Sequence, residues 1–319
     1  MTDYVIRRLL LIIPTILITS GIIFGLLRIL PADAAEFIAR QEQSQPPTPE
    51  QIQDVRRQLG LDKPLPIQYV NFWRDVVTGS FGYSLFNKRS VMSQLGERLP
   101  TSLELIFMAI IISAVWGISV GIIAALKQDT WLDYIFRSFA IAGLSVPVFW
   151  SGILVIVLPS LWFHWTPLAK FYQFYEDPVA NFKLMIFPAV ILGINLGAPV
   201  MRMTRTMMLE VMRQDYVRTA RAKGLAEKIV ILRHSLQNAL IPVITILGLQ
   251  VILGIGGTLV LETVFSIPGM GRLLIVTSLS RRDYPMVQGI TLFIAMGVVF
   301  VNLIIDLAYG VIDPRVRYR

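Results

Sequence analysis

The chain of 319 residues contains no cysteine and only two histidines, His164 and His234. The missing cysteines exclude disulfides, thiol catalysis, iron–sulfur clusters and thiolate zinc sites. The two histidines lie 70 positions apart, and neither has a histidine or carboxylate nearby at a metal-binding spacing. We therefore expect neither a metal site nor a catalytic thiol.

Charged residues are also scarce, at 16% of the chain, whereas 55% of the residues are hydrophobic and the mean hydropathy is +0.63. A soluble domain carries about a quarter charged residues, so the composition predicts a membrane protein in contact with lipid. The net charge of +8 is typical of nucleic-acid binding as well, but in a membrane protein it more often reports orientation. We expect no nucleic-acid partner.

Motifs for nucleotide binding and nucleophilic catalysis are missing too. The chain has no G-x-x-x-x-G-K-[ST] phosphate loop, no Gly-Lys dipeptide and no H-E-x-x-H motif. The glycines at Gly254–Gly257 and Gly269–Gly271 lack the third glycine of a dinucleotide fingerprint. We therefore expect no catalytic residues, no ATPase site and no cofactor on this chain.

Long uncharged runs locate the membrane spans. A helix needs roughly 20 apolar residues to cross the hydrocarbon core of a bilayer. Six runs fit this length: Leu9–Leu27, Leu105–Leu126, Ser138–Pro159, Leu184–Met201, Ser235–Leu261 and Tyr284–Ile305. The fold class expected is therefore an all-α integral membrane protein with six transmembrane helices, and an even number of spans places both termini on one side.

The distribution of Lys and Arg predicts which side that is. The side of the termini holds 15 of the 29 basic residues, eight of them in residues 202–233, whereas the two short loops opposite hold two and three. Basic residues accumulate on the cytoplasmic side, so both termini are expected there. The first run follows Arg7 and Arg8 and precedes Ala32-Asp33-Ala34, as in a signal peptide. With 19 residues it exceeds the usual apolar length of a signal, about 7 to 15 residues, so a retained helix is favoured.

Polar and small residues within the spans have two interpretations. Glu104, Asn195 and Gln250 either line a transport pathway or, as the plainer interpretation, form hydrogen bonds between helices. The pairs Gly117/Gly121 and Gly193/Gly197 permit close approach of helices. Both features favour a packed bundle.

The segment 31–101 is predicted to form a small helical extracytoplasmic domain. Thr48 with Gln51 predicts a capping box at the start of a helix that Gly60 ends. A second amphipathic stretch, Ile67–Val77, places its aromatic residues on one face. These faces are expected to pack on each other and on the ends of the spans, the alternative being a binding surface for a ligand or partner.

The loop 202–237 is longer than a helix connection needs. Gly224 interrupts a helical pattern between Arg218–Lys223 and a second short amphipathic run, Glu227–Leu236. A short helix between two spans, with its polar residues outward, would let a soluble partner push on the bundle. The alternative is a basic loop retained only for orientation, but eight basic residues exceed what topology requires.

Several sequence blocks resemble a known family. They are Tyr4–Leu9, Leu59–Tyr69, Arg98–Glu104, Leu144–Trp150, Tyr216–Gly224 with Arg233–Pro242, and Glu262–Leu273. Together these blocks are similar to the permease subunits of binding-protein-dependent ABC importers, in particular the first permease of the dipeptide, oligopeptide and nickel group. The loop signature Glu-Ala-Ala of the wider family stands here as Arg218-Thr219-Ala220.

The resemblance implies a permease of the bacterial inner membrane that moves di- or oligopeptides with ATP hydrolysed elsewhere. Its partners would be a second homologous permease, two ATP-binding cassette subunits that hold ATP and Mg, and an extracytoplasmic solute-binding protein. The domains implied are residues 1–30 (N-terminus and first span), 31–101 (outer segment), 102–310 (five spans with the coupling loop 202–237) and 311–319 (cytoplasmic tail).

Two sets of residues follow from the resemblance. The ATPase-coupling set is Arg218, Thr219, Ala220, Arg221, Ala222, Lys223, Gly224, Leu225, Arg233 and His234. The set expected at the outer gate or binding-protein contact is Phe265, Pro268, Gly269, Gly271 and Arg272. No substrate-binding residue is assigned.

Three functions compete at this point. The first is the import permease, with oligosaccharides, nickel chelates or opine-like solutes as alternative cargo. The second is a secondary transporter or channel that works without ATP, against which the absence of an evident inverted repeat argues. The third is a structural or receptor protein, which would leave the long basic loop without a purpose.

Overall fold

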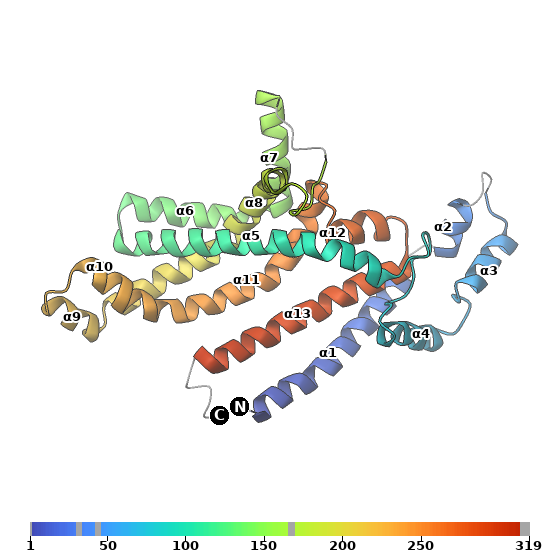
Figure 1. Cartoon of the computed structure of the whole chain (residues 1–319), viewed down its shortest axis with the longest axis horizontal. Helices are drawn as coiled ribbons and strands as arrows, with labels where there is room; N and C mark the ends of the chain where they lie inside the picture. The colour runs from blue at the N-terminus through green and yellow to red at the C-terminus, as the bar shows by residue number, and fades with distance from the viewer. Residues whose placement is uncertain (1, 30–33, 42–45, 165–169, 313–319) are drawn as a thin grey trace. The chain divides into compact units, whose positions relative to one another are not determined.

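Helices make up most of the fold. A computed structural model describes residues 2–29, 34–41, 46–164 and 170–312. In chain order its helices are α1 (Thr2–Ile29), α2 (Ala34–Gln41), α3 (Pro49–Gln58), α4 (Leu65–Val77), α5 (Val91–Leu126), α6 (Trp131–Ser145), α7 (Val148–Phe163), α8 (Pro178–Met212), α9 (Asp215–Ala222), α10 (Glu227–Ile229), the π-helical turn η1 (Val230–Ser235), α11 (Leu236–Val264), α12 (Met270–Arg272), the π-helical turn η2 (Leu273–Leu279) and α13 (Tyr284–Ile312) (Figure 1). Most of the predicted tail, residues 313–319, lies outside the described residues, as do Ala32 and Asp33 of the cleavage-like sequence.

Five helices in the described ranges are long and apolar enough to cross a membrane. They contain Leu10–Ile29, Val91–Leu126, Pro178–Met212, Glu227–Val264 and Tyr284–Ile305. The bent pair α6 and α7 makes a sixth span if the two helices are counted together. The all-α membrane fold expected from the uncharged runs is confirmed.

The predicted third span, Ser138–Pro159, is not one straight helix. The chain turns by 100° between α6 and α7. Val146 is extended, with φ −90° and ψ 122°, and Pro147 precedes the first residue of α7. Proline has no N–H to continue the helical hydrogen bonds, and its ring disfavours the α conformation in the residue before it. The bend therefore follows from Pro147 within a run whose hydropathy alone looks continuous.

The chain divides into two units. Unit 1 comprises Met1–Ser102 and Pro268–Phe300, and unit 2 comprises Leu103–Ile267 and Val301–Arg319. In unit 1, α4 packs its buried Phe72 and Val76 into a core with the start of α5, η2 and the start of α13. Leu95 and Ile290 are fully buried at the centre of this core.

The helices of the outer segment begin where their capping residues predict. Thr48 Oγ1 accepts the Gln51 N–H at 3.4 Å, and Gln51 Oε1 accepts the Thr48 N–H at 2.8 Å, so the capping box at the start of α3 is confirmed. Gly60, with φ 65°, follows the end of α3 in the left-handed conformation that glycine adopts at low cost. The predicted second helix is α4.

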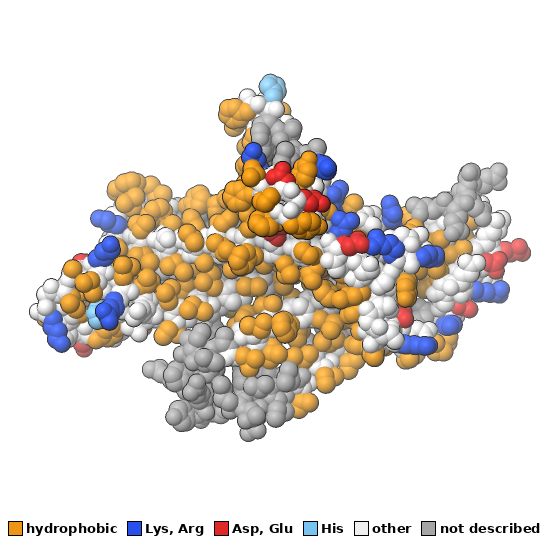
Figure 2. All heavy atoms as spheres, in the orientation of Figure 1, with side chains coloured by type: hydrophobic (Ala, Val, Ile, Leu, Met, Phe, Trp, Pro, Cys, Tyr) orange, Lys and Arg blue, Asp and Glu red, His pale blue; other side chains and the backbone are white. Residues whose placement is uncertain are grey.

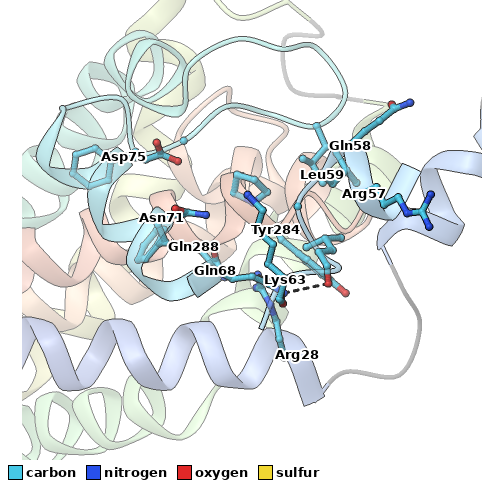
Figure 3. A pocket seen from close by; sticks show the side chains of 17 residues that line it. Arg28, Arg57, Gln58, Leu59, Lys63, Gln68, Asn71, Asp75, Tyr284 and Gln288 are labelled. Carbon is cyan, nitrogen blue, oxygen red and sulfur yellow. Dashed lines mark hydrogen bonds between the residues drawn. The ribbon is translucent and has the colours of Figure 1, made fainter. Parts of the chain in front are cut away.

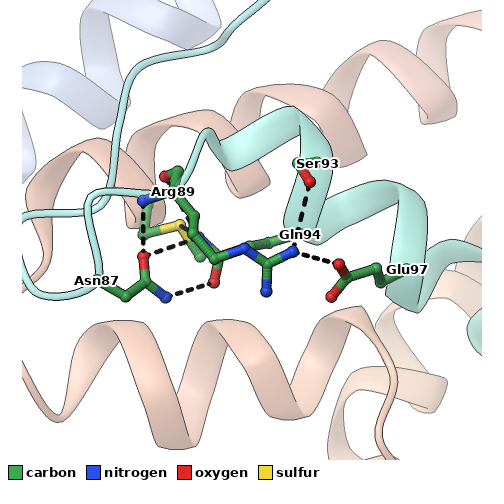
Figure 4. Close-up of polar contacts among 6 residues, drawn as sticks. Asn87, Arg89, Ser93, Gln94 and Glu97 are labelled. Atoms are coloured by element: carbon green, nitrogen blue, oxygen red, sulfur yellow. Dashed lines mark hydrogen bonds and ion pairs between the residues drawn. The ribbon is translucent and has the colours of Figure 1, made fainter.

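A polar network ties the turn before α5 to the first turns of that helix (Figure 4). Asn87 accepts the Arg89 N–H at 3.0 Å and donates to Gln94 Oε1 at 3.1 Å. Arg89 also forms an ion pair with Glu97. Gln94 in turn donates to the Met286 sulfur of α13 at 3.3 Å. The network fixes α5 against α13 within unit 1.

Helix α8 is the central helix of unit 2, in contact with α6, α7 and α11. It also meets α5 through the two glycine pairs. A Cβ on Gly121 of α5 would lie 2.7 Å from the Met201 carbonyl oxygen, and a Cβ on Gly193 of α8 would lie 2.9 Å from the Ala109 carbonyl oxygen. Each helix therefore presents glycine where the other's backbone comes closest, as the small-residue spacing predicts.

Polar residues within the spans of unit 2 join helices to one another. Asn195 of α8 donates to the Gly143 carbonyl of α6 at 2.9 Å. Asn181, near the start of α8, donates to Glu104 of α5 at 3.3 Å. The plainer interpretation of Glu104 and Asn195, hydrogen bonding between helices, is thus what the structure shows. Large apolar side chains such as Phe107 and Val115 stay exposed on α5, as expected of a surface that faces lipid.

Candidate functional site

The predicted coupling loop forms a hairpin of α9, α10 and η1, named here the α9–η1 hairpin (residues 215–235). Its turn begins with a C-terminal cap of α9. The Leu225 N–H donates to the Ala220 carbonyl at 3.4 Å, and the Gly224 N–H donates to the Arg221 carbonyl at 2.9 Å. These two bonds form a Schellman motif, whose left-handed position is held by Gly224 with φ 75°. Gly224 therefore permits the turn through its backbone conformation.

A small apolar core holds the hairpin together. Val217 and Ala220 of α9 pack with Val230 of η1, and all three are buried. Val211 at the end of α8 packs against the same cluster. These contacts fasten α9 to α8 and η1, so a force applied to α9 would be passed to the long helices on either side of the loop.

An ion pair closes the hairpin across Gly224. Arg221 Nη2 lies 2.7 Å from Glu227 Oε1, and Arg221 Nε donates to Glu227 Oε2 at 3.2 Å. The hydrogen bonds that Arg221 donates to Glu227 raise the pKa of the Arg221 guanidinium above its ordinary value. This two-bond geometry is specific to arginine. Both side chains are partly exposed, at 38% and 55%, so the pair orients the hairpin more than it stabilises it.

Further contacts involve the first half of α9. At the start of α9, Thr219 Oγ1 donates to the Asp215 carbonyl at 2.9 Å, and Arg218 lies 3.4 Å from the Asp215 carboxylate. Tyr216 accepts a hydrogen bond from Asn238 of α11 at 3.0 Å. The hairpin is thus tied to the first turn of α11 as well as to α8.

The outward face of the hairpin is basic with apolar side chains between the charges. Of the predicted coupling set, the structure exposes Arg218, Thr219, Arg221, Ala222, Lys223, Gly224, Leu225 and Arg233, buries Ala220 and leaves His234 half-buried. Large apolar side chains on the same hairpin are also exposed, namely Tyr216, Ile229 and Leu232. Figure 2 shows Lys and Arg side chains with a histidine gathered over α9 and α10. A surface that mixes basic and exposed apolar side chains is more typical of a contact with a soluble protein than of a surface that faces only water.

The predicted outer set divides between the two units. In unit 1, Gly269 precedes α12 in an extended conformation, and the Met270 N–H donates to Ser102 Oγ at 2.9 Å. The Pro268 carbonyl accepts from Arg98 at 3.4 Å. Pro268, Gly269 and Arg272 line a small cavity of about 150 Å³ with Arg98, and Gly271 is buried.

Phe265 of the outer set belongs to unit 2. It caps the end of α11 and is buried, with an exposed fraction of 7%. Its ring packs against α7, where a Cβ on Gly152 would lie 3.4 Å from it. In this structure Phe265 is a packing residue of unit 2 rather than an exposed contact.

Comparisons with known proteins place these features in a family. Residues 117–318 match the family described as the binding-protein-dependent transport system inner membrane component, and residues 1–106 match the N-terminal part of such membrane components. The chain belongs to this family. It is therefore a multi-pass permease, and the α9–η1 hairpin lies within the matched region.

Relatives of this permease match from end to end. The di/tripeptide transport system permease protein of Pseudomonas aeruginosa is 38% identical over 339 residues, and the dipeptide transport system permease protein of Escherichia coli K12 is 38% identical over 342 residues; each alignment covers 100% of both chains. A putative peptide transport system permease protein of Brucella abortus is 39% identical over 318 residues, again covering both chains fully.

A solved structure has a similar fold. It is the crystal structure of an amino acid ABC transporter with histidines, which matches with a TM-score of 0.51 and 15% identity over 74% of this chain and 96% of the other. At this identity the likeness concerns the fold alone.

Two groups of residues in this permease were not found from the sequence. Asp133 of α6 is fully buried and paired with Arg205 of α8. Arg28, Gln68 and Gln288 meet at a cavity in unit 1. For Asp133, Arg205 and Arg28 the only signal was a charge near the end of an apolar run, which does not reveal the distant partner. The two glutamines gave no signal.

Proposed function

We propose that this chain is the permease subunit of an ABC importer that carries di- and oligopeptides across the inner membrane. The observation that carries the proposal is the end-to-end similarity, at 38–39% identity, to proteins named as dipeptide and peptide transport system permeases. Oligosaccharides, nickel chelates and opine-like solutes remain alternative cargo for the same kind of importer.

The working unit proposed contains this chain, a second similar permease, two ATPase subunits that bind ATP and Mg, and an extracytoplasmic binding protein. Six spans in one chain would supply half of a pathway. The excess of Lys and Arg, with 15 of 29 on the side of the termini, supports an orientation in which both termini and the α9–η1 hairpin are cytoplasmic and the segment 31–101 is extracytoplasmic.

The α9–η1 hairpin is the proposed contact for the ATPase. Its buried Val217, Ala220 and Val230 join it to α8, and the hydrogen bond between Asn238 and Tyr216 joins it to α11. A movement of the ATPase against the exposed basic face would therefore displace both helices together. The pathway would open and close as these helices change their arrangement, with the work done by ATP bound on the partner.

The test uses the whole transporter, reconstituted in vesicles with its binding protein and ATPase subunits. Gly224→Pro removes the left-handed turn and the Gly224 N–H, because proline requires a negative φ. Gly79→Pro is a matched control: Gly79 has φ 80°, also donates its N–H to a carbonyl three residues back, and also has no atom within 4 Å of a Cβ. Only Gly224 lies in the hairpin.

We expect Gly224→Pro and Arg221→Glu to keep ATP hydrolysis but to lose most peptide uptake, while Gly79→Pro keeps hydrolysis and uptake coupled. Normal uptake by both hairpin variants would contradict the coupling role. Transport by the purified chain alone, driven by an ion gradient without any ATPase subunit, would contradict the proposed function as a whole.

A further inference from the structure

Unit 1 contains a cavity that shares no residue with the α9–η1 hairpin. It has a volume of about 330 Å³ and lies between the end of α1, the turn after α3, α4 and the start of α13 (Figure 3). This volume lies within the range of small-molecule sites, and it is larger than a single water requires. The lining is mainly polar, with Arg28, Asn71, Asp75 and Gln288 among its residues.

Arg28 is held in place beside this cavity by three groups. Its Nη2 donates to Gln68 Oε1 at 2.9 Å, and its guanidinium lies over the Phe24 ring at 4.2 Å and the Tyr284 ring at 5.1 Å. Gln68 is itself fixed, because its Nε2 donates to the Lys63 carbonyl at 2.8 Å. Figure 3 shows the Arg28 side chain reaching from α1 toward Gln68 and Lys63. The guanidinium is thus preorganised without being neutralised by a carboxylate in the described part of the chain.

Two hydrogen-bond donors at the cavity are left without an acceptor among the described residues. They are Nη1 of Arg28 and Nε2 of Gln288, which is only 4% exposed. A buried donor without a partner is costly, and such groups are rare in folded proteins. Two of them beside one cavity indicate a ligand that accepts hydrogen bonds.

The charges around the cavity favour an anion. Arg28, Arg57 and Lys63 contribute three positive groups to the lining, and Asp75 is its single carboxylate. Arg57 also lies 3.8 Å from Asp54, so Arg28 and Lys63 are the positive groups that favour an anion. Burial raises the pKa of the Asp75 carboxyl above its ordinary value, but the positive groups outnumber this carboxylate whether or not it is ionised. Arginine and amide donors together form the usual cradle of a carboxylate or phosphate oxygen.

We propose that this cavity binds an oxyanion, with Arg28 Nη1 and Gln288 Nε2 as the donors to its oxygens. Two sources carry this chemistry: a free small molecule with a carboxylate or phosphate, and the phosphate of a lipid headgroup. The site is separate from the α9–η1 hairpin and does not depend on the cargo proposed above.

The experiment uses the full-length chain in nanodiscs and a variant that removes one donor. Gln288→Met keeps the size of the side chain and removes Nε2. Gln53→Met, at an exposed position of α3 that does not line the cavity, is the matched control. Gln288→Glu preserves the shape and places a negative charge at the site, so it serves as a second variant if the methionine variant fails to insert.

In phosphatidylcholine nanodiscs, calorimetric titrations use dialanine, dialanine amide and inorganic phosphate as probes. A second set of nanodiscs contains phosphatidylglycerol, and native mass spectrometry measures the phosphatidylcholine and the phosphatidylglycerol retained by the protein in each set. Binding of dialanine or phosphate assigns the site to a free small molecule, provided that the amide, which has no carboxylate, does not bind. Retention of either phospholipid without binding of the free probes assigns it to a lipid.

We expect at least about a tenfold loss of binding or retention in Gln288→Met and Gln288→Glu, as the removal of one charge-assisted hydrogen bond predicts, and no change in Gln53→Met. The proposal is overturned if no probe binds and neither phospholipid is retained, because the cavity then holds only water. It is also overturned if the Gln288 variants bind as the unaltered chain does, or if dialanine amide binds as well as dialanine.

Discussion

Asp133 and Arg205 form a two-bond ion pair that joins the first turn of α6 to α8. Arg205 Nε lies 2.7 Å from Asp133 Oδ1, and Arg205 Nη2 lies 2.6 Å from Oδ2. Asp133 is completely buried and also accepts the Asp129 N–H at 3.1 Å. The side chain of Arg205 is 17% exposed. The bonds to Arg205 and to the Asp129 N–H thus hold the turn between α5 and α6 against α8.

Removal of Asp133 should destabilise unit 2 strongly. Asp133→Ala leaves the Arg205 charge partly buried without its partner, which costs about 3 kcal/mol or more. Arg137→Ala is the control, because Arg137 lies 3.9 Å from the same carboxylate but is 44% exposed, and an exposed pair contributes less than about 1 kcal/mol. Thermal unfolding of the purified permease measures both. Equal losses in the two variants would mean that the two-bond pair has no special role.

This ion pair also shows where prediction from sequence stops. The spans follow from the lengths of the uncharged runs, and the start of α3 follows from Thr48 and Gln51, because these signals are local. Asp133 and Arg205 lie 72 positions apart, so their pairing depends on how α6 packs on α8. The bend at Pro147 has a local cause, but hydropathy does not report backbone direction.

The same distinction, between features with a local signal and features that depend on folding, applies to the candidate site. Gly224 was predicted to interrupt the helix, and its left-handed turn is what a glycine after a helix commonly forms. The partner of Arg221 was not predicted, since Glu227 lies in the next helix and becomes its neighbour only through the turn. The cavity beside Gln288 has no sequence signal, because a single glutamine in an apolar run gives no indication of an empty space next to it.

The glycine contacts between α5 and α8 predict that an added methyl group lowers the stability of the protein at Gly121 but not at Gly256. Gly121→Ala would place a Cβ 2.6 Å from Thr204 Cβ and 2.7 Å from the Met201 carbonyl oxygen. The carbonyl belongs to the backbone of α8, so the helices must move apart, at a cost of about 1 to 3 kcal/mol. Gly256→Ala in α11, which meets no atom within 4 Å, should leave the unfolding temperature nearly unchanged. A Gly121→Ala protein as stable as the Gly256→Ala protein would show that the close approach is unimportant.

Asp283, which precedes α13 in unit 1, predicts a dependence of stability on pH. It is buried, with an exposed fraction of 3%, and its pKa is raised above 3.8 by burial, although hydrogen bonds from Ser84 and the Leu85 N–H oppose this. Lys88 is the charged group that acts on it, and it also lowers the pKa. Burial outweighs these effects, so the folded state favours the protonated carboxyl.

The sign of the effect follows from this raised pKa. The contribution of Asp283 to stability is fully present below the unfolded pKa near 3.8 and is lost as pH rises through the higher folded pKa. Asp283→Asn, which cannot ionise, should therefore gain stability relative to the unaltered permease as pH rises from about 4 to 7. Unfolding temperatures of both proteins across this range provide the measurement. A difference that stays constant with pH would contradict the raised pKa.

Reversal of the Arg221–Glu227 pair separates the two roles of Arg221. If Arg221 only closes the turn across Gly224, the double variant Arg221→Glu with Glu227→Arg restores an ion pair and should restore uptake. If the outward positive charge at position 221 also meets the ATPase, the double variant should fold as the unaltered chain does but keep the uptake defect of Arg221→Glu. We expect the second result, because the pair is partly exposed and a surface pair contributes at most about 1 kcal/mol to stability. Peptide uptake and ATP hydrolysis, measured together in reconstituted vesicles for both single variants and the double variant, distinguish the two. Full recovery of uptake in the double variant would assign Arg221 to the turn alone.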